Sequence, residues 1–280
     1  MTQESAPSSG GTSPPHAALI VAHPGHELRV YHWMETHQPL YFCMTDGSGR
    51  EGQSRMDSTS RLLKRAGATP GSIYGRFTDR EIYQFLLEGR HEVFTGLFEE
   101  LTGALIAQDI SVVAGDSPEG MNPTHDLCRH LIDSAVAAVE RITGRHIPNY
   151  EFVLDAPLKD CTPELYPAAV WLPLDEAALE RKLDAARDYT ELKGEIEEGL
   201  KYYGKKAFAV ECLIPSTASA SLEKFEHEAP AYERYGREGV MRHGKTFGKY
   251  EDVITFHQHV KPVVQAIAAA SRDYVSKHPG

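Results

Sequence analysis

The chain has 280 residues, of which 25% are charged and 41% hydrophobic, and its formal net charge is −11. This length and composition indicate a globular protein with a substantial core. The acidic balance argues against binding to nucleic-acid phosphates or anionic lipid. No apolar run reaches the roughly 18 residues of a membrane span. The four cysteines form no C-x-x-C pair, which predicts a reduced, cytoplasmic protein.

The N-terminal segment differs in composition from the rest of the chain. Residues 1–15 are rich in Ser, Pro and Gly and lack the basic and apolar segments of a signal peptide, so we expect a disordered tail. Residues 16–280 contain no internal repeat and no linker that would divide them. We therefore predict a single α/β domain, in which residues 150–280 contribute a less regular region around a substrate pocket.

Short apolar runs alternate with segments of helical periodicity in the first half of the chain. The predicted strands are 16–22, 39–45 and 109–116, and the predicted helices are 27–37, 54–68, 79–89, 91–108 and 123–144. This alternation predicts right-handed βαβ units and a Rossmann-like, mostly parallel sheet flanked by helices. The carboxyl ends of the three strands should meet at one crevice.

The pattern is less regular in the second half. We predict strands at 149–158 and 206–214, a charged helix at 175–203 and a polar loop at 230–254. A terminal helix is expected over 253–275, beginning or interrupted near Pro262.

The stretch AHPGHE at residues 22–27 follows the first predicted strand. Pro24 favours an extended backbone at His23, so this is not the H-E-x-x-H helix of zincins. His26 enters the next helix, and His125 lies at the start of another. Three imidazoles placed in this way predict a metal site with an open fourth position. The alternative is a loop with two unrelated histidines and a simple helix cap.

These motifs resemble those of a known family. AHPGHE is similar to the Ala-His-Pro-Asp-Asp-Glu motif of the PIG-L/LmbE-like zinc N-deacetylases, and Asn-Pro-Thr-His at 122–125 is similar to their later His-Pro-Asp-His motif. The resemblance covers residues 17–145. It implies a Rossmann-like fold and zinc-dependent hydrolysis of N-acetyl groups on sugars, glycolipids or related small molecules.

The resemblance also implies roles for individual residues. His23, His26 and His125 would hold Zn²⁺, with His26 at a position where the family has an aspartate ligand. Gly25 stands where the family has its general base, and Asn122 stands where it has a histidine that helps to stabilise the oxyanion. Three imidazoles also suit iron, nickel or copper.

The glycine at the base position is the main departure from the family. A general base contributes about 10²–10⁴-fold to the rate. Three neutral ligands leave the charge of zinc uncancelled, which lowers the pKa of bound water and partly compensates. We expect Gly25 to leave an open space that another carboxylate occupies. Asp46, after the second predicted strand, and Glu119, in the third crevice loop, are the leading candidates, and Asp116 and Glu27 also lie near the crevice.

The expected function is therefore a metal-dependent amide hydrolase, an N-deacetylase of an N-acetylated sugar, glycolipid or natural-product intermediate. Metal-bound hydroxide would attack the acyl carbon, Asn122 would steady the oxyanion, and Asp46 or Glu119 would move the proton. Two alternatives use the same fold: a non-hydrolytic binding or regulatory protein, and another metal-assisted reaction at a C–N or N–N bond.

Overall fold

The computed structural model describes residues 16–49, 52–154, 167–216, 224–243 and 252–279. The predicted tail at 1–15 and the end of the strand predicted at 149–158 lie outside these residues. Within the described ranges, no helix is long and apolar enough to cross a membrane.

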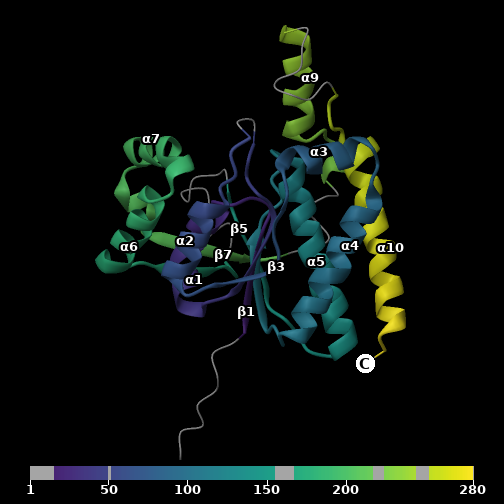
Figure 1. The fold of residues 1–280 in the computed structure, drawn as a ribbon, viewed down its shortest axis with the longest axis horizontal. Coiled ribbons are helices and arrows are strands. Elements are labelled where there is room, and N and C mark those ends of the chain that lie inside the picture. Colours follow the sequence, from purple (N-terminus) through teal and green to yellow (C-terminus); the bar gives the residue numbers. More distant parts are fainter. Residues whose placement is uncertain (1–15, 50–51, 155–166, 217–223, 244–251, 280) are drawn as a thin grey trace, which may run out of the picture.

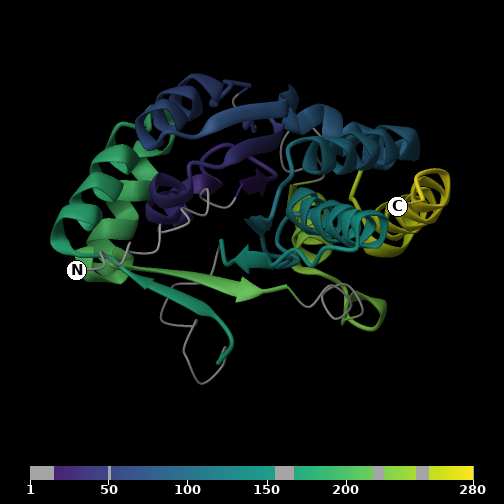
Figure 2. The same cartoon turned by 90° about the horizontal axis from the view of Figure 1, so that it is seen from below.

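A mostly parallel sheet forms the centre of the molecule (Figures 1 and 2). Its strand order is β3-β2-β1-β4-β5-β7-β6. The strands are β1 (Ala17–Val21), β2 (Leu40–Thr45), β3 (Thr69–Phe77), β4 (Val112–Asp116), β5 (Asn149–Phe152), β6 (Val170–Pro173) and β7 (Val210–Pro215). Neighbours from β3 to β5 are parallel, whereas β7 is antiparallel to both β5 and β6. The predicted α/β class is confirmed.

Helices cover both faces of the sheet (Figure 1). One face carries α3 (Asp79–Leu87), α4 (His91–Ala107), α5 (Pro123–Thr143) and α10 (Lys261–Lys277). The other face carries α1 (Tyr31–His37), α2 (Met56–Ala66), α6 (Glu176–Arg187) and α7 (Lys193–Tyr203). Shorter helical turns are η1 (His26–Val30), η3 (Thr190–Leu192), η4 (Lys205–Phe208), η5 (Lys224–Glu226) and η6 (Phe256–Val260).

Successive side chains of strand β1 point to opposite sides of the sheet, and all are buried because helices cover both sides. Ala18 and Ile20 join the apolar cluster beneath α4, α5 and α10. Leu19 and Val21 join the cluster beneath α1 and α2. The uninterrupted apolar run in the sequence therefore encodes a central strand, and its carboxyl end lies at the middle of the sheet.

The start of α5 is fixed by local sequence. The Asn122 side chain accepts a hydrogen bond from the Thr124 N–H at 2.9 Å, and Pro123 takes the first helical position, where its missing N–H costs nothing. The helix ends at Gly144, which has a φ of +69°. The predicted bounds of this helix are confirmed, and His125 lies in its first turn.

The edge strand β3 was not predicted from the sequence. It contains Pro70, Gly71 and Gly75, residues that are depleted in strands, and most of its side chains are at least partly exposed. Its pairing with β2 includes register irregularities. Tertiary pairing therefore overrides a weak local preference at this edge.

The second half also differs from the prediction. The charged stretch at 175–203 forms two helices, α6 and α7, separated by η3. The segment expected as a polar loop contains α9 (Ala231–His243), and β6 was not predicted. These elements carry short or mainly polar patterns, in which periodicity is weak.

Candidate functional site

The site lies where the carboxyl ends of three neighbouring strands meet. Strand β1 pairs with β2 on one side and with β4 on the other. The chain therefore leaves β1 in one direction along the sheet and later returns to its other side, which is the switch point at which open α/β sheets bind ligands. His23 follows β1, Thr45 ends β2 and Asp116 ends β4.

Three histidines from two separate parts of the chain pack against one another at this point. The ring centroids of His23 and His26 lie 5.3 Å apart, those of His23 and His125 lie 5.0 Å apart, and those of His26 and His125 lie 4.7 Å apart. His23 is 7% exposed and His125 is 8% exposed. The structure thus brings together the three histidines that the sequence singled out.

His23 is held through its Nδ1 atom. This nitrogen lies 2.8 Å from Oδ1 of Asp79, at the start of α3, and 2.8 Å from Oγ1 of Thr45. Burial opposes ionisation of Asp79, but the hydrogen bond and charge of His23 outweigh it and lower the pKa of Asp79. Nε2 of His23 faces Nδ2 of Asn122 at 3.3 Å. When Nδ1–H donates to this carboxylate, the lone pair of Nε2 is left to bind a metal, as is usual for metal-bound histidines that a carboxylate orients.

His26 is held in the same way. Its Nδ1 lies 2.9 Å from Oδ2 of Asp116, which also accepts the Ala22 N–H at 2.7 Å. Asp116 is fully buried. Burial alone would lower the pKa of His26, but the charge and hydrogen bond of Asp116 raise it above its ordinary value. Asp116, which the sequence suggested as a replacement base, therefore orients an imidazole.

His125 has a different environment. Its Nδ1 atom is buried and has no hydrogen-bond partner among the described residues, a costly state for a polar atom that a ligand would relieve. Burial, followed by the charges of His26 and His23, holds the pKa of His125 well below its ordinary value. The ring is therefore neutral, the form that binds a metal.

The donor set of three imidazoles suits a transition metal. The rings pack edge to face, with interplanar angles of 82°, 64° and 87°. Among the side chains that the structure describes, no three His, Cys, Asp or Glu residues stand ready to hold a metal ion. Three neutral or carboxylate-oriented imidazoles fit such an ion chemically.

The expectation of an open space at Gly25 is wrong. Gly25 has a φ of +106°, and a Cβ atom built on it would lie 2.5 Å from Cδ1 of Leu192. Leu192, in η3, fills the space into which a side chain at this position would extend. The backbone conformation also disfavours any residue with a side chain. No aspartate can stand here without displacing Leu192.

Glu27 fixes the loop between the histidines. It is fully buried and accepts hydrogen bonds from the Gly25 N–H, the Tyr41 hydroxyl and the Thr59 hydroxyl at 2.8, 3.0 and 2.9 Å. The hydroxyls of Thr59 and Tyr189 lie 2.7 Å apart. Burial raises the pKa of Glu27, and these hydrogen bonds partly offset the rise. Its contacts are those of a residue that shapes the loop.

The remaining predicted residues lie around the same edge of the sheet. Oδ1 of Asp46 accepts the Ser48 N–H at 2.9 Å, the Asx turn that its Asp-Gly context also allowed. Oε1 of Glu119 accepts the Leu154 N–H at 2.7 Å. The predicted adjacency of the strands that precede Asp46 and His23 is confirmed.

Thr45 and Asp79 were missed by sequence reasoning. Thr45 is the last residue of a predicted strand, and its position beside the first strand carried a signal that we did not use. Asp79 follows β3, which we did not predict. Once β3 is recognised as parallel to β2, its carboxyl end belongs to the same edge as His23, and Asp79 becomes a candidate.

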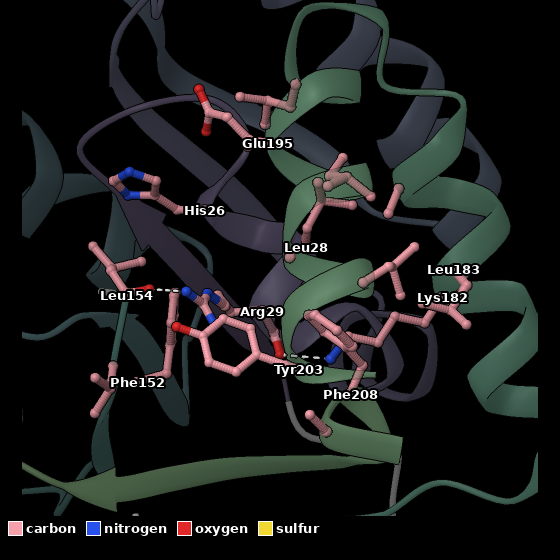
Figure 3. A pocket seen from close by; sticks show the side chains of 18 of the residues that line it. His26, Leu28, Arg29, Phe152, Leu154, Lys182, Leu183, Glu195, Tyr203 and Phe208 are labelled. Atoms are coloured by element: carbon pink, nitrogen blue, oxygen red, sulfur yellow. Dashed lines mark hydrogen bonds between the residues drawn. The ribbon is translucent and has the colours of Figure 1, made fainter. Parts of the chain in front are cut away.

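A large cavity opens next to the histidines, with a volume of about 570 Å³. His26 and His125 form part of its wall, and most of the remainder comes from η1, the end of β5, α6, α7 and η4. In Figure 3, His26 and Glu195 lie at one end of the pocket, whereas Tyr203 and Phe208 lie toward the other. This volume is within the usual range for small-molecule sites.

Comparison with known proteins supports the fold. No family model matches the chain, and no curated protein matches it. The A40926 pseudoaglycone deacetylase Dbv21 is similar in structure, with a TM-score of 0.50 and 19% identity over 72% of this chain and 97% of that chain. For the zinc-inhibited form of teicoplanin deacetylase Orf2, the TM-score is 0.49 and the identity is 12%, over 72% of this chain and 100% of that chain. For the conserved protein TT1542 from Thermus thermophilus, the TM-score is 0.47 and the identity is 13%, over 73% of this chain and 95% of that chain. The likeness to Dbv21 shows that the two chains share an α/β fold.

Proposed function

We propose that this protein is a metal-dependent hydrolase that cleaves the amide bond of an N-acylated small molecule, such as an N-acetylated sugar, glycolipid or natural-product intermediate. The observation that carries the proposal is the packing of His23, His26 and His125 at the switch point of the sheet. Two of these rings have a carboxylate at Nδ1. A purely structural cluster has no need for two such buried pairs, each of which carries a desolvation cost.

In this proposal the three histidines hold Zn²⁺, and Asp79 and Asp116 orient His23 and His26. A bound zinc ion supplies a Lewis acid for the amide carbonyl and lowers the pKa of water. The adjoining cavity receives part of the substrate.

Asn122 is suited to bind the oxyanion that forms at the acyl carbon. Its Oδ1 accepts the Thr124 N–H, and its Nδ2 lies 3.3 Å from Nε2 of His23. The helix cap thus turns the amide N–H groups toward the histidines. Asn122→Asp keeps an acceptor for the cap but removes the donor. We expect turnover to fall by about 10²–10³-fold while the thermal midpoint stays close to that of the wild type.

Proton transfer needs a group other than residue 25, because a glycine has no ionisable side chain. Leu192 fills the space beside Gly25. Asp46 and Glu119 are the proposed candidates. Asp46→Asn and Glu119→Gln are compared with the wild type at equal metal content. The variant that removes the base should lower turnover by about 10²-fold or more. Equal turnover in both variants would assign this step to neither residue.

The glycine at position 25 also favours a second candidate function. A protein that binds an N-acylated molecule without cleaving it needs the cavity but no base, and the contact between Leu192 and this position suits such a role. Release of the acyl group distinguishes the two functions, because a binding protein gives none.

The test of the proposed hydrolase combines metal content with acetate release from a panel of N-acetylated sugars. We expect about one metal per chain, with loss of both metal and activity in His23→Ala and His125→Ala. His146→Ala is the matched control, since this ring is 85% exposed and lies beyond the opposite end of α5 from His125. Full metal content in both site variants would contradict the assignment, and metal binding without acetate release would favour the binding protein.

A further inference from the structure

The cavity beside the histidines has mainly aliphatic walls. Beyond His26, its lining includes Leu28 from η1, Leu183 from α6, and Ile196 and Leu200 from α7. Phe152 and Phe208 close other parts of it, as Figure 3 shows. An acetyl methyl group, which is comparable in size to one water molecule of about 30 Å³, would leave most of the 570 Å³ unfilled.

Two of the cations in the wall, Lys182 and Arg29, are engaged by the protein itself. Nζ of Lys182 donates to the backbone oxygen of Arg29 at 2.9 Å and to Oε1 of Glu211 at 2.8 Å. The guanidinium of Arg29 donates to the backbone oxygen of Leu154. Figure 3 shows the hydrogen bonds from Lys182 to Arg29 and from Arg29 to Leu154. A sugar ring buried here would lose water without gaining comparable partners, whereas a hydrocarbon chain needs none.

Polar and charged residues are present at both ends of the cavity. The end at His26 includes Glu195, which is exposed, and Arg55 also contributes to the lining. The end toward Phe208 includes Phe152 and Tyr203 together with Arg29 and Lys182, whose charged groups donate to protein oxygens. An N-acyl substrate has a polar amine portion on one side of the amide and an acyl chain on the other.

We propose that this cavity binds the hydrocarbon chain of an acyl group longer than acetyl, so that the protein acts on medium- or long-chain N-acyl sugars or amines. This inference rests on the proposed function for the position of the amide, which lies at the histidines. The hydrocarbon chain of the substrate then extends from His26 between α6 and α7 toward Phe208. Each methylene buried there should tighten binding about fourfold until the cavity is full.

Small residues leave room for the chain. Gly199 lies on α7 in the wall, and a Cβ atom built on it would be 3.7 Å from Cζ of Phe208, an ordinary contact. Gly199→Leu therefore places a side chain in the cavity without strain at the backbone. Gly194 lies on the same helix, is exposed and has nothing within 4 Å of an added Cβ. Gly194→Leu is thus a matched control outside the cavity.

The test measures binding of N-acetylglucosamine and N-octanoylglucosamine to the full chain by isothermal titration calorimetry. We expect the octanoyl compound to bind about 4 × 10³-fold more tightly, from six added methylenes at about fourfold each. Gly199→Leu should weaken its binding at least tenfold, and Gly194→Leu should leave it unchanged. Ala207→Leu, in η4 of the same wall, provides a second variant should Gly199→Leu fold poorly.

Equal affinity for the two compounds, or octanoyl binding that neither cavity variant changes, would overturn the inference. Hydrolysis of both compounds is followed in parallel. Chain-dependent binding without cleavage of either would support the cavity assignment and contradict the hydrolase. Cleavage of the acetyl and octanoyl compounds at equal rates would support the hydrolase and contradict the cavity assignment.

Discussion

The two faces of the sheet are stabilised in different ways. Beneath α4, α5 and α10 the side chains form one extensive apolar cluster, in which a void lined by Ile20 and Phe42 measures only about 10 Å³. The face that carries α1, α2, α6 and α7 contains the cavity of about 570 Å³. Buried polar groups such as Glu27 and Glu211 connect the elements on this second face. Packing is dense on the first face, which also contains the buried Arg129–Asp133 pair on α5, whereas on the second face buried hydrogen bonds surround a ligand-sized space.

The largest expected effect concerns a buried charge pair on the face that carries α1, α2, α6 and α7, which we call the hollow face because it contains the cavity. Glu211 is fully buried and accepts hydrogen bonds from Lys182 Nζ and from the His32 and Trp33 N–H groups. Glu211→Gln leaves the Lys182 charge without its partner and should lower the free energy of unfolding by about 3–5 kcal/mol. Urea denaturation measures this change.

An exposed ion pair on the same face is the control for that prediction. Arg65 and Asp188 are 3.0 Å apart, and the Asp188 side chain is 76% exposed. Asp188→Asn should change the free energy of unfolding by at most about 1 kcal/mol. Similar losses in both acidic variants would show that buried polar pairs do not hold the hollow face.

A matched pair of leucines compares packing on the two faces. Leu105, on α4, is fully buried in the apolar cluster, whereas Leu200, on α7, is partly exposed in the cavity wall. Leu105→Ala should cost about 2–5 kcal/mol, because the dense cluster cannot collapse around the lost atoms. Leu200→Ala should cost less than about 1 kcal/mol, since it enlarges a space that is already open. Equal losses in urea would remove the distinction between the faces.

The smallest effect is predicted at Gly25. An alanine there takes on a φ of +106° and contacts Leu192, which should lower the free energy of unfolding by about 1–3 kcal/mol. Gly194→Ala, in the exposed part of a helix, should be neutral or stabilising by up to about 1 kcal/mol. A Gly25→Ala protein as stable as the wild type in thermal melts would mean that this loop tolerates a side chain, and that Leu192 yields easily.

Sequence reasoning located the central part of the fold because the signals there are strong and local. The buried strands β1, β2 and β4 are continuous apolar runs, and α5 has both its cap and its terminal glycine in the sequence. These elements bring His23, His26 and His125 together. The convergence of the histidines therefore followed from strand ends and one helix start.

The rest of the site depends on contacts that no local pattern encodes. Asp79 contacts His23 although the two residues are 56 positions apart in the sequence. Asp79 follows β3, whose proline and glycines make that strand hard to predict from the sequence. Leu192 reaches Gly25 from η3, a break inside a stretch that looked like one continuous helix. The side chain that fills the expected base position could be found only from the tertiary structure.

The most direct test of the central claim is anomalous diffraction at the zinc edge from crystals grown with zinc. We predict one strong peak at the carboxyl end of β1, about 2.0–2.1 Å from a ring nitrogen of each of His23, His26 and His125. Asp79 and Asp116 should remain hydrogen-bonded to His23 and His26. No peak at these histidines, or a peak only elsewhere on the molecule, would contradict the claim that they form a metal site.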